Sequence, residues 1–214
     1  MRYLIVCGGK IDKEFGLNEI KTDGIDAIIA ADSGMDFLYE NGVTPDIIVG
    51  DFDSATTKAL DFFERKGQTE IHRLNPIKDD TDTEYAIRLA ISEGARSIVL
   101  LGATGSRIDH VLGNISLLGI GLESGTDISI IDTNNRIRMA DKPVTIEKSA
   151  QYGRFVSLIA LTDDNEVSLK GFKYPVTDYS FDRFTSLGIS NEIVDDHALI
   201  DIHRGKFIII ESKD

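Results

Sequence analysis

Pro-Asp-Ile-Ile-Val-Gly-Asp-Phe-Asp-Ser, residues 45–54, is the stretch that decides how this chain folds. Its apolar run 47–49 is typical of a short buried strand, and Asp51 and Asp53 follow that strand directly. Asp32 stands in the same position after another apolar run, residues 26–30. Acidic residues that come repeatedly after buried strands indicate a sheet that carries a polar site at one edge.

The first half of the 214-residue chain alternates short β-rich runs with helical patterns. We expect strands at residues 3–7, 26–30, 47–49, 70–73 and 97–101. We expect helices from Ser33, an N-cap, to residue 42, and over residues 56–66, 81–93 and 108–122. This alternation predicts an α/β fold with a mostly parallel, Rossmann-like sheet that has helices on both faces.

The rhythm changes near residue 128, where the apolar runs become short and mostly alternating. These runs are residues 128–131, 155–161, 166–169, 198–202 and 207–210, with turn residues between them. The pattern predicts a C-terminal antiparallel β-sandwich or barrel. We therefore divide the chain into an α/β catalytic domain, residues 1–125, and an all-β domain, residues 126–214.

Composition limits the classes of partner. The formal net charge is −13, with no basic cluster, which argues against binding to nucleic acid or to an anionic membrane. The single cysteine, Cys7, excludes an internal disulfide framework and is expected to be a buried core thiol. No apolar stretch is long enough to span a membrane, and the N-terminal run is too short for a secretion signal. We expect a cytoplasmic protein.

The acidic residues predict a metal site. In an extended segment, side chains at positions i and i+2 share a face, so Asp51 and Asp53 are expected to face one cation. Carboxylates that converge repel one another unless a positive charge lies between them, and Mg²⁺ carrying a polyphosphate supplies that charge. The alternative is purely local, with Asp53 or Ser54 capping the next helix.

Two further segments are candidates for binding phosphate. Lys-Asp-Asp-Thr-Asp, residues 78–82, precedes a strongly amphipathic helix, and Lys78 offers a cation for a phosphate oxygen. Helix capping by Thr81, with Glu84 completing a capping box, is the structural alternative there. Gly-Ala-Thr-Gly-Ser-Arg, residues 102–107, lies between a strand and a helix, where backbone N–H groups and Arg107 suit an anion.

Taken in order, these motifs resemble the thiamine pyrophosphokinase family. The resemblance rests on Ala-Asp-Ser-Gly (31–34), residues 45–54, Lys-Asp-Asp-Thr-Asp-Thr-Glu-Tyr-Ala (78–86), Gly-Ala-Thr-Gly-Ser-Arg-Ile-Asp-His-Val-Leu-Gly-Asn (102–114) and Gly-Ile-Ser-Asn-Glu (188–192). It implies transfer of a pyrophosphoryl group from ATP to the hydroxyl of thiamine. It also implies a homodimer with shared active sites. One departure is that this chain has no Trp to contact thiamine.

The resemblance also implies roles for individual residues. The implied catalytic residues are Asp32, Asp51, Asp53, Asp82 and Asp109, of which Asp51, Asp53 and Asp82 hold Mg²⁺. ATP is implied to contact Lys78, Asp79, Thr81, Gly102, Thr104, Gly105 and Arg107. Thiamine is implied to meet Ser190, Asn191 and Asp109. Either Asp109 or Asp32 accepts the hydroxyl proton or orients the cationic thiazolium, and the sequence leaves both assignments open.

Two other functions compete with this interpretation. A metal-dependent phosphatase also uses an Asp-x-Asp motif, but its motif ordinarily follows the first strand, whereas Asp51-Phe52-Asp53 follows the third. A non-catalytic sensor of nucleotide or thiamine needs binding groups but tolerates loss of the metal-binding acids. All of those acids are present here, which favours the enzyme.

Overall fold

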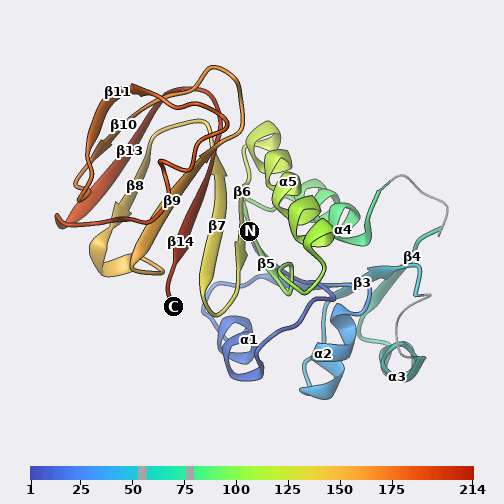
Figure 1. Cartoon of the computed structure of the whole chain (residues 1–214). Helices are drawn as coiled ribbons and strands as arrows, with labels where there is room; N and C mark the ends of the chain where they lie inside the picture. The colour runs from blue at the N-terminus through green and yellow to red at the C-terminus, as the bar shows by residue number, and fades with distance from the viewer. Residues whose placement is uncertain (53–56, 76–79) are drawn as a thin grey trace. The chain divides into compact units, whose positions relative to one another are not determined.

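The computed structural model describes residues 1–52, 57–75 and 80–214 of the chain. It divides into a first unit, Met1–Thr133, and a second unit, Asn134–Asp214. Figure 1 shows the α-helices among the strands of the first unit, and mostly strands in the second.

The first unit is built on a parallel sheet. Its strands are β1 (Arg2–Val6), β2 (Ala27–Ala31), β3 (Ile47–Gly50), β4 (Glu70–Arg73), β5 (Ser97–Leu101) and β6 (Asp127–Ile131). They pair in the order β6-β5-β1-β2-β3-β4, and every pair is parallel. The order reverses between β1 and β5, because the chain builds outward to β4 and then returns to the other side of β1. This is the doubly wound arrangement that the alternating sequence predicts.

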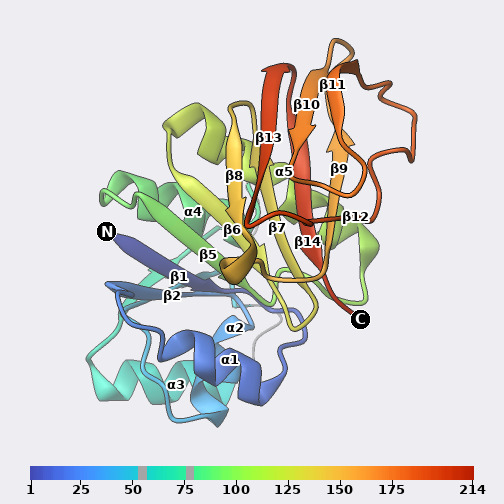
Figure 2. The same ribbon diagram turned by 90° about the vertical axis from the view of Figure 1, so that its left-hand side faces the viewer.

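Helices cover both faces of this sheet. They are α1 (Lys13–Ile20), α2 (Gly34–Glu40), α3 (Thr57–Lys66), α4 (Asp82–Ser92) and α5 (Ile108–Ser124). Figures 1 and 2 show α1, α2 and α3 on one face and α4 and α5 on the other. Buried apolar side chains of β1, β2 and β3 pack against residues such as Leu38 and Phe63 of the covering helices. Parallel strands need such cover on both faces, which explains their continuous apolar runs.

The second unit consists of two antiparallel sheets. One has the order β12-β9-β14-β7 and the other β11-β10-β13-β8. The strands are β7 (Asn135–Ala140), β8 (Val144–Glu147), β9 (Phe155–Ala160), β10 (Glu166–Lys170), β11 (Val176–Ser180), β12 (Asn191–Glu192), β13 (His197–Arg204) and β14 (Phe207–Ser212). A single 3-10 turn, Lys148–Ala150, is the helical element among its residues.

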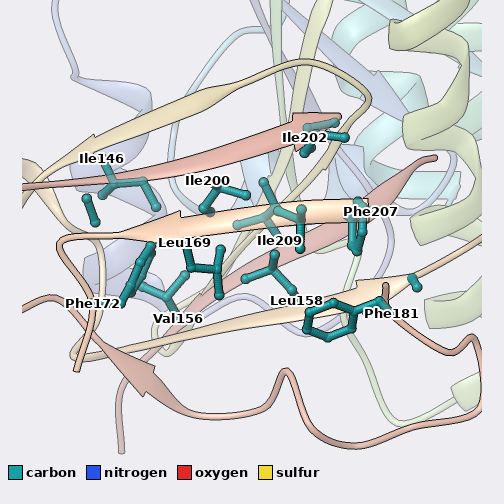
Figure 3. Packing of buried hydrophobic residues seen from close by; sticks show 14 of the residues in the cluster. Ile146, Val156, Leu158, Leu169, Phe172, Phe181, Ile200, Ile202, Phe207 and Ile209 are labelled. Atoms are coloured by element: carbon teal, nitrogen blue, oxygen red, sulfur yellow. The ribbon is translucent and has the colours of Figure 1, made fainter. Parts of the chain in front are cut away.

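One apolar core lies between these two sheets. Figure 3 shows Leu158 and Ile209 from the first sheet facing Leu169 and Ile200 from the second, with Phe181 at one end. The predicted antiparallel β domain is therefore confirmed, and it is a sandwich. Alternating apolar residues on each strand supply the inner faces, as sandwich packing requires.

Some expectations from the sequence are wrong in detail. Residues 128–131 do not open the antiparallel half, because β6 pairs in parallel with β5 and belongs to the first unit. The division expected after residue 125 thus falls before the last strand of the parallel sheet. Helix α1 was not expected, because its apolar pattern is weak and Gly16 interrupts it. Ser33 precedes α2, but its hydroxyl makes no capping hydrogen bond.

Other local expectations are confirmed. Cys7 is buried, and burial raises the pKa of its thiol to about 11. Thr81 caps α4, accepting a hydrogen bond from the backbone N–H of Glu84 at 3.2 Å. The Glu84 carboxylate instead contacts Arg88, so the reciprocal half of the capping box is not formed. Among the described residues, no helix is both long and apolar enough to cross a membrane.

Candidate active site

Three carboxylates meet beyond the carboxyl ends of the parallel strands. Asp32 follows β2, Asp51 follows β3, and Asp82 is the first residue of α4. Each can offer one oxygen such that the three oxygens lie within 4.8 Å of one another, and each residue is partly buried. Residues 50 positions apart in the sequence thus form one acidic group, which we call the carboxylate cluster.

Asp32 of the carboxylate cluster has an unusual backbone conformation. Its φ of +49° lies in the left-handed region, which costs about 1–2 kcal/mol for a residue with a side chain. Its N–H donates to the carbonyl of Val49 at 2.8 Å, which ties the end of β2 to β3. A Cβ atom at Gly50 would lie 3.2 Å from the Asp32 Cα. The glycine therefore permits the close approach that brings Asp32 beside Asp51.

Asp51 is followed by a turn. Phe52 has φ +62°, so the backbone turns directly after Asp51 and is not extended there. The expectation that Asp51 and Asp53 face one cation stays a prediction, because it depends on Asp53. Asp53 itself lies outside the described residues. The metal ligands expected from the sequence were Asp51, Asp53 and Asp82. The described structure groups Asp51 and Asp82 with Asp32, which was expected only to line the reaction centre.

Asp82 is placed by the start of a helix. The Thr81 cap fixes where α4 begins, and the helix macrodipole favours an acidic side chain in this first turn. Thr83, the next residue, directs its hydroxyl to the Cys7 sulfur at 3.7 Å, so α4 also contacts the end of β1. Lys78 and Asp79, which were expected to bind ATP, lie outside the described residues.

The donor set of the carboxylate cluster suits a hard divalent cation. Carboxylate oxygens are the ligands that Mg²⁺ prefers, and Mg²⁺ usually keeps only one or two protein carboxylates beside water and phosphate. Three like charges at this spacing repel one another, so a cation stabilises them together. The residues present therefore fit a magnesium ion bound to phosphate.

Two glycine-containing loops meet where the strand order reverses. Gly9, after β1, donates its N–H to the carbonyl of Gly102 at 2.9 Å, after β5. Gly102 has φ +68°, and a Cβ there would lie 2.5 Å from the Cys7 carbonyl oxygen. The Thr104 hydroxyl donates to Asp132 at 2.8 Å. The loop of residues 8–9 therefore contacts the loop after β5, which the sequence did not predict.

Arg107 and Asp109 lie at the exposed start of α5. Their side chains form an ion pair at 2.6 Å, and both are about two-thirds exposed. The hydrogen bond from Arg107 is the main cause that lowers the pKa of Asp109 to about 2. The same hydrogen bond raises the pKa of Arg107. Asp109 is not among the residues of the carboxylate cluster.

Ser190 and Asn191 belong to the second unit. Ser190 has φ +61° and donates its N–H to the Ser157 hydroxyl at 3.0 Å. The Asn191 side chain is buried and joins the backbone of Tyr174 through two hydrogen bonds, of 3.1 and 2.9 Å. Asn191 therefore fixes the segment that carries Tyr174, whose ring is exposed.

Comparisons with known proteins cover both units. The family model described as thiamin pyrophosphokinase, catalytic domain, matches residues 21–130, and the model described as thiamin pyrophosphokinase, vitamin B1 binding domain, matches residues 143–207. A thiamine pyrophosphokinase from Bacillus subtilis is 35% identical over 188 residues, which cover 87% of each chain.

Solved structures agree with this match. The crystal structure of thiamine pyrophosphokinase from Bacillus subtilis covers all of this chain and of its own, with a TM-score of 0.89 and 32% identity. A thiamin pyrophosphokinase from Geobacillus thermodenitrificans gives a TM-score of 0.86 at 29% identity, covering 100% of this chain and 98% of its own.

The parallel sheet, the acidic edge and the catalytic-domain match define an α/β transferase with an appended β-sandwich. More particularly, the chain belongs to the thiamine pyrophosphokinase family and is an enzyme, a thiamine diphosphokinase. The phosphatase and sensor interpretations are not favoured by these matches.

Proposed function

We propose that this chain transfers a pyrophosphoryl group from ATP to the hydroxyl oxygen of thiamine, giving thiamine diphosphate and AMP. The observation that carries the proposal is the carboxylate cluster at the strand ends, within the segment matched by the catalytic-domain model. The hydroxyl oxygen of thiamine attacks the β-phosphorus of ATP. The bond between the β-phosphorus and the oxygen that bridges the α- and β-phosphates breaks, and AMP leaves with that oxygen. Such a transfer depends on alignment and on charge neutralisation.

The carboxylate cluster is the proposed magnesium site. Asp32, Asp51 and Asp82 would hold the ion, with Asp53 as a further ligand expected from the sequence. A bound Mg²⁺ would supply positive charge to neutralise the charge that develops on the phosphate groups during transfer. The chain's own task is to hold these oxygens in place before the nucleotide arrives, which the tie between Asp32 and Val49 supports.

ATP is proposed to lie along the loops at the switch point of the sheet. Gly102, Thr104 and Gly105 line the loop after β5, where the chain turns into α5, and backbone N–H groups in such loops suit phosphate. Arg107 adds a guanidinium, while Lys78, Asp79 and Thr81 stay contacts predicted from the sequence. The Thr104 hydroxyl donates to Asp132, so its proposed role is to shape the loop.

The acceptor site is proposed to use Asp109 as a fixed negative charge. A pKa of about 2 makes this carboxylate a weak base at neutral pH, because an efficient base has a pKa near the working pH. It keeps its charge, however, and so suits the cationic thiazolium. Asp32 then remains the carboxylate proposed to accept the hydroxyl proton, through the oxygen that it does not offer to the metal ion. Ser190 and Asn191 stay predicted thiamine contacts, and they are expected to be contributed by the partner subunit of the proposed homodimer.

A homodimer in the cytoplasm is the proposed form of the enzyme. Large apolar side chains gather in the segment just before Ser190. Phe184 is 89% exposed, Leu187 61% and Ile189 48%. Exposed apolar residues grouped in this way favour an interface, and a second copy of this chain is the proposed partner. The buried thiol of Cys7 suits a reducing compartment.

The test is AMP release from ATP and Mg²⁺ with thiamine, compared with thiamine monophosphate and with no acceptor. We expect AMP only with thiamine, in equal amount to thiamine diphosphate. Release of inorganic phosphate from ATP alone would indicate a phosphatase. Calorimetric binding of thiamine without AMP release would indicate a sensor. Light scattering coupled to gel filtration measures the oligomeric state, and a monomer at all concentrations would contradict the dimer.

A further inference from the structure

Strand β4 is an edge strand without a fully buried residue, and its partly buried Ile71 side chain packs against the core of the first unit. All four of its residues, Glu70–Arg73, are exposed or partly exposed, whereas every residue of its neighbour β3 is buried. Its last two residues point to opposite faces of the sheet, because side chains alternate along a strand. We infer that His72 and Arg73 are positioning residues, which hold Asp82 and Asp51 of the carboxylate cluster from the two faces.

His72 holds the helix that begins with Asp82. Its Nδ1 atom lies 3.2 Å from the hydroxyl oxygen of Tyr85, which is one turn along α4 from Asp82. Its Nε2 atom lies 2.7 Å from the Glu70 carboxylate, so the ring is anchored on β4 itself. Helix α4 otherwise packs on β1, β2 and β3. The His72–Tyr85 contact therefore links the edge strand to the helix that presents Asp82.

Arg73 holds the turn that contains Asp51. Its guanidinium carbon lies 5.4 Å from the centre of the Phe52 ring, a cation–π distance, and its side chain also forms an ion pair with Glu64 of α3. Phe52 directly follows Asp51 and has φ +62°. A left-handed residue with a large side chain persists only where its surroundings hold it. Packing of the partly buried Phe52 ring against the core of the first unit supplies part of that support, and the Arg73 guanidinium adds to it.

The inference rests on the proposed magnesium site. Removing a group that orients a metal ligand without touching the metal lowers metal affinity by about 10- to 100-fold. His72 and Arg73 act through Tyr85 and Phe52 and not on the carboxylates themselves, so we place their effect at the lower end of this range. Their loss is expected to loosen the spacing of Asp51 and Asp82 while the carboxylates stay present.

The test measures Mn²⁺ binding by electron paramagnetic resonance without nucleotide, so that it does not depend on turnover. Tyr85→Phe removes only the hydroxyl that His72 contacts, and Arg73→Met removes the guanidinium but keeps an apolar stem. We expect each to weaken Mn²⁺ binding by about tenfold. Two matched controls are expected to bind Mn²⁺ as the wild type does. They are Arg88→Met, whose arginine lies on α4 and pairs with Glu84, and Arg65→Met, whose arginine is exposed and follows Glu64 in the sequence.

Asp82→Asn separates this inference from the proposed function. If Asp82→Asn weakens Mn²⁺ binding but Tyr85→Phe and Arg73→Met bind as wild type, the positioning role is overturned and the metal site stands. If Asp82→Asn also binds as wild type, the metal site itself is wrong. Arg73→Gln, which removes the positive charge but keeps a polar side chain, replaces Arg73→Met if that variant does not fold.

Turnover supplies a second readout. Saturating Mg²⁺ is expected to restore the kcat of Tyr85→Phe and Arg73→Met, because their carboxylates remain, but not that of Asp82→Asn. A general loss of folding would lower kcat at every Mg²⁺ concentration. If saturating Mg²⁺ does not restore the kcat of folded Tyr85→Phe or Arg73→Met, the positioning role is contradicted.

Discussion

Both units of the molecule gather charged side chains, but they do so in opposite ways. In the first unit, Asp32, Asp51 and Asp82 bring three like charges within 4.8 Å at the edge of a sheet. In the second, Glu211 is completely buried, and two arginines surround it. Arg136 approaches the carboxylate at 2.7 Å and Arg138 at 2.9 Å.

The difference lies in where the compensating charge comes from. The buried carboxylate of Glu211 also accepts the backbone N–H of Tyr152 at 2.9 Å, so the chain itself satisfies it. The three carboxylates of the carboxylate cluster repel one another, so they are stabilised most by a cation that binds together with a ligand. The comparison indicates that a charged group whose partners are all within the chain stabilises the fold. A group of like charges that lacks such compensation is suited to binding a cation.

The largest effect is expected at the buried group. Glu211→Ala leaves two partly buried arginines without their common carboxylate and is expected to lower the free energy of unfolding by about 3 kcal/mol. Denaturation in urea measures this loss. Asp163→Ala is the control, because that carboxylate is 91% exposed and its ion pair with Arg183 contributes little. Equal stability of the two variants would contradict the structural role of Glu211.

The carboxylate cluster is expected to respond in the opposite way. Asp51→Asn should lower turnover by at least about 100-fold, the scale of losing one strong electrostatic contact in the transition state. Its stability without Mg²⁺ should stay near wild type or rise, because one repulsive charge is removed. Asp53→Asn is expected to lose turnover similarly, with unchanged far-UV circular dichroism. Near-normal turnover in either variant would remove that residue from the metal site.

A smaller effect is expected in the glycine loop. Gly102→Ala places a side chain at φ +68° and a Cβ 2.5 Å from the Cys7 carbonyl oxygen. We expect a loss of about 1–2 kcal/mol in stability, together with a higher KM for ATP. Gly113→Ala, in the middle of α5 with no neighbouring atom within 4 Å, is the control and should stabilise the protein by roughly 0.5–1 kcal/mol. A Gly102→Ala variant with wild-type stability and KM would show that the loop adapts.

The smallest effect is expected at the exposed Arg107–Asp109 pair. Arg107 lowers the pKa of Asp109 from 3.8 to about 2, so the pair stabilises the folded state above pH 4 and loses this contribution as the pH falls through 2. Arg107→Met should return the Asp109 pKa toward 3.8. A carboxyl-carbon NMR titration measures that shift, with Arg88→Met as the control. An unchanged Asp109 pKa in Arg107→Met would show that another group lowers it.

The order of elements in the first unit was largely predictable from the sequence. Continuous apolar runs predicted β1, β2, β3 and β5, and the Thr81 cap predicted the start of α4. Helix α1 was missed because its apolar periodicity is weak. Strand β6 was misassigned because a short apolar run does not indicate which strand it pairs with. Strand pairing is a long-range property, so local patterns leave it open.

The carboxylate cluster was predicted only in part. The sequence named Asp51 and Asp82 as ligands from a resemblance, and Asp32 as a neighbour of the reaction. The left-handed turn at Phe52 replaced the extended geometry that had been expected there. A non-glycine residue adopts such a backbone only under tertiary support, which a sequence pattern does not reveal.

By itself, the sequence determined the two kinds of unit, the acids at the strand ends and the family, because periodicity and motif spacing are local and directly readable. Only the tertiary structure decided that Asp32 joins Asp51 and Asp82, that Asp109 pairs with Arg107, and that β4 contacts both acid-bearing segments. These arrangements depend on which strands lie side by side and on backbone angles that packing enforces.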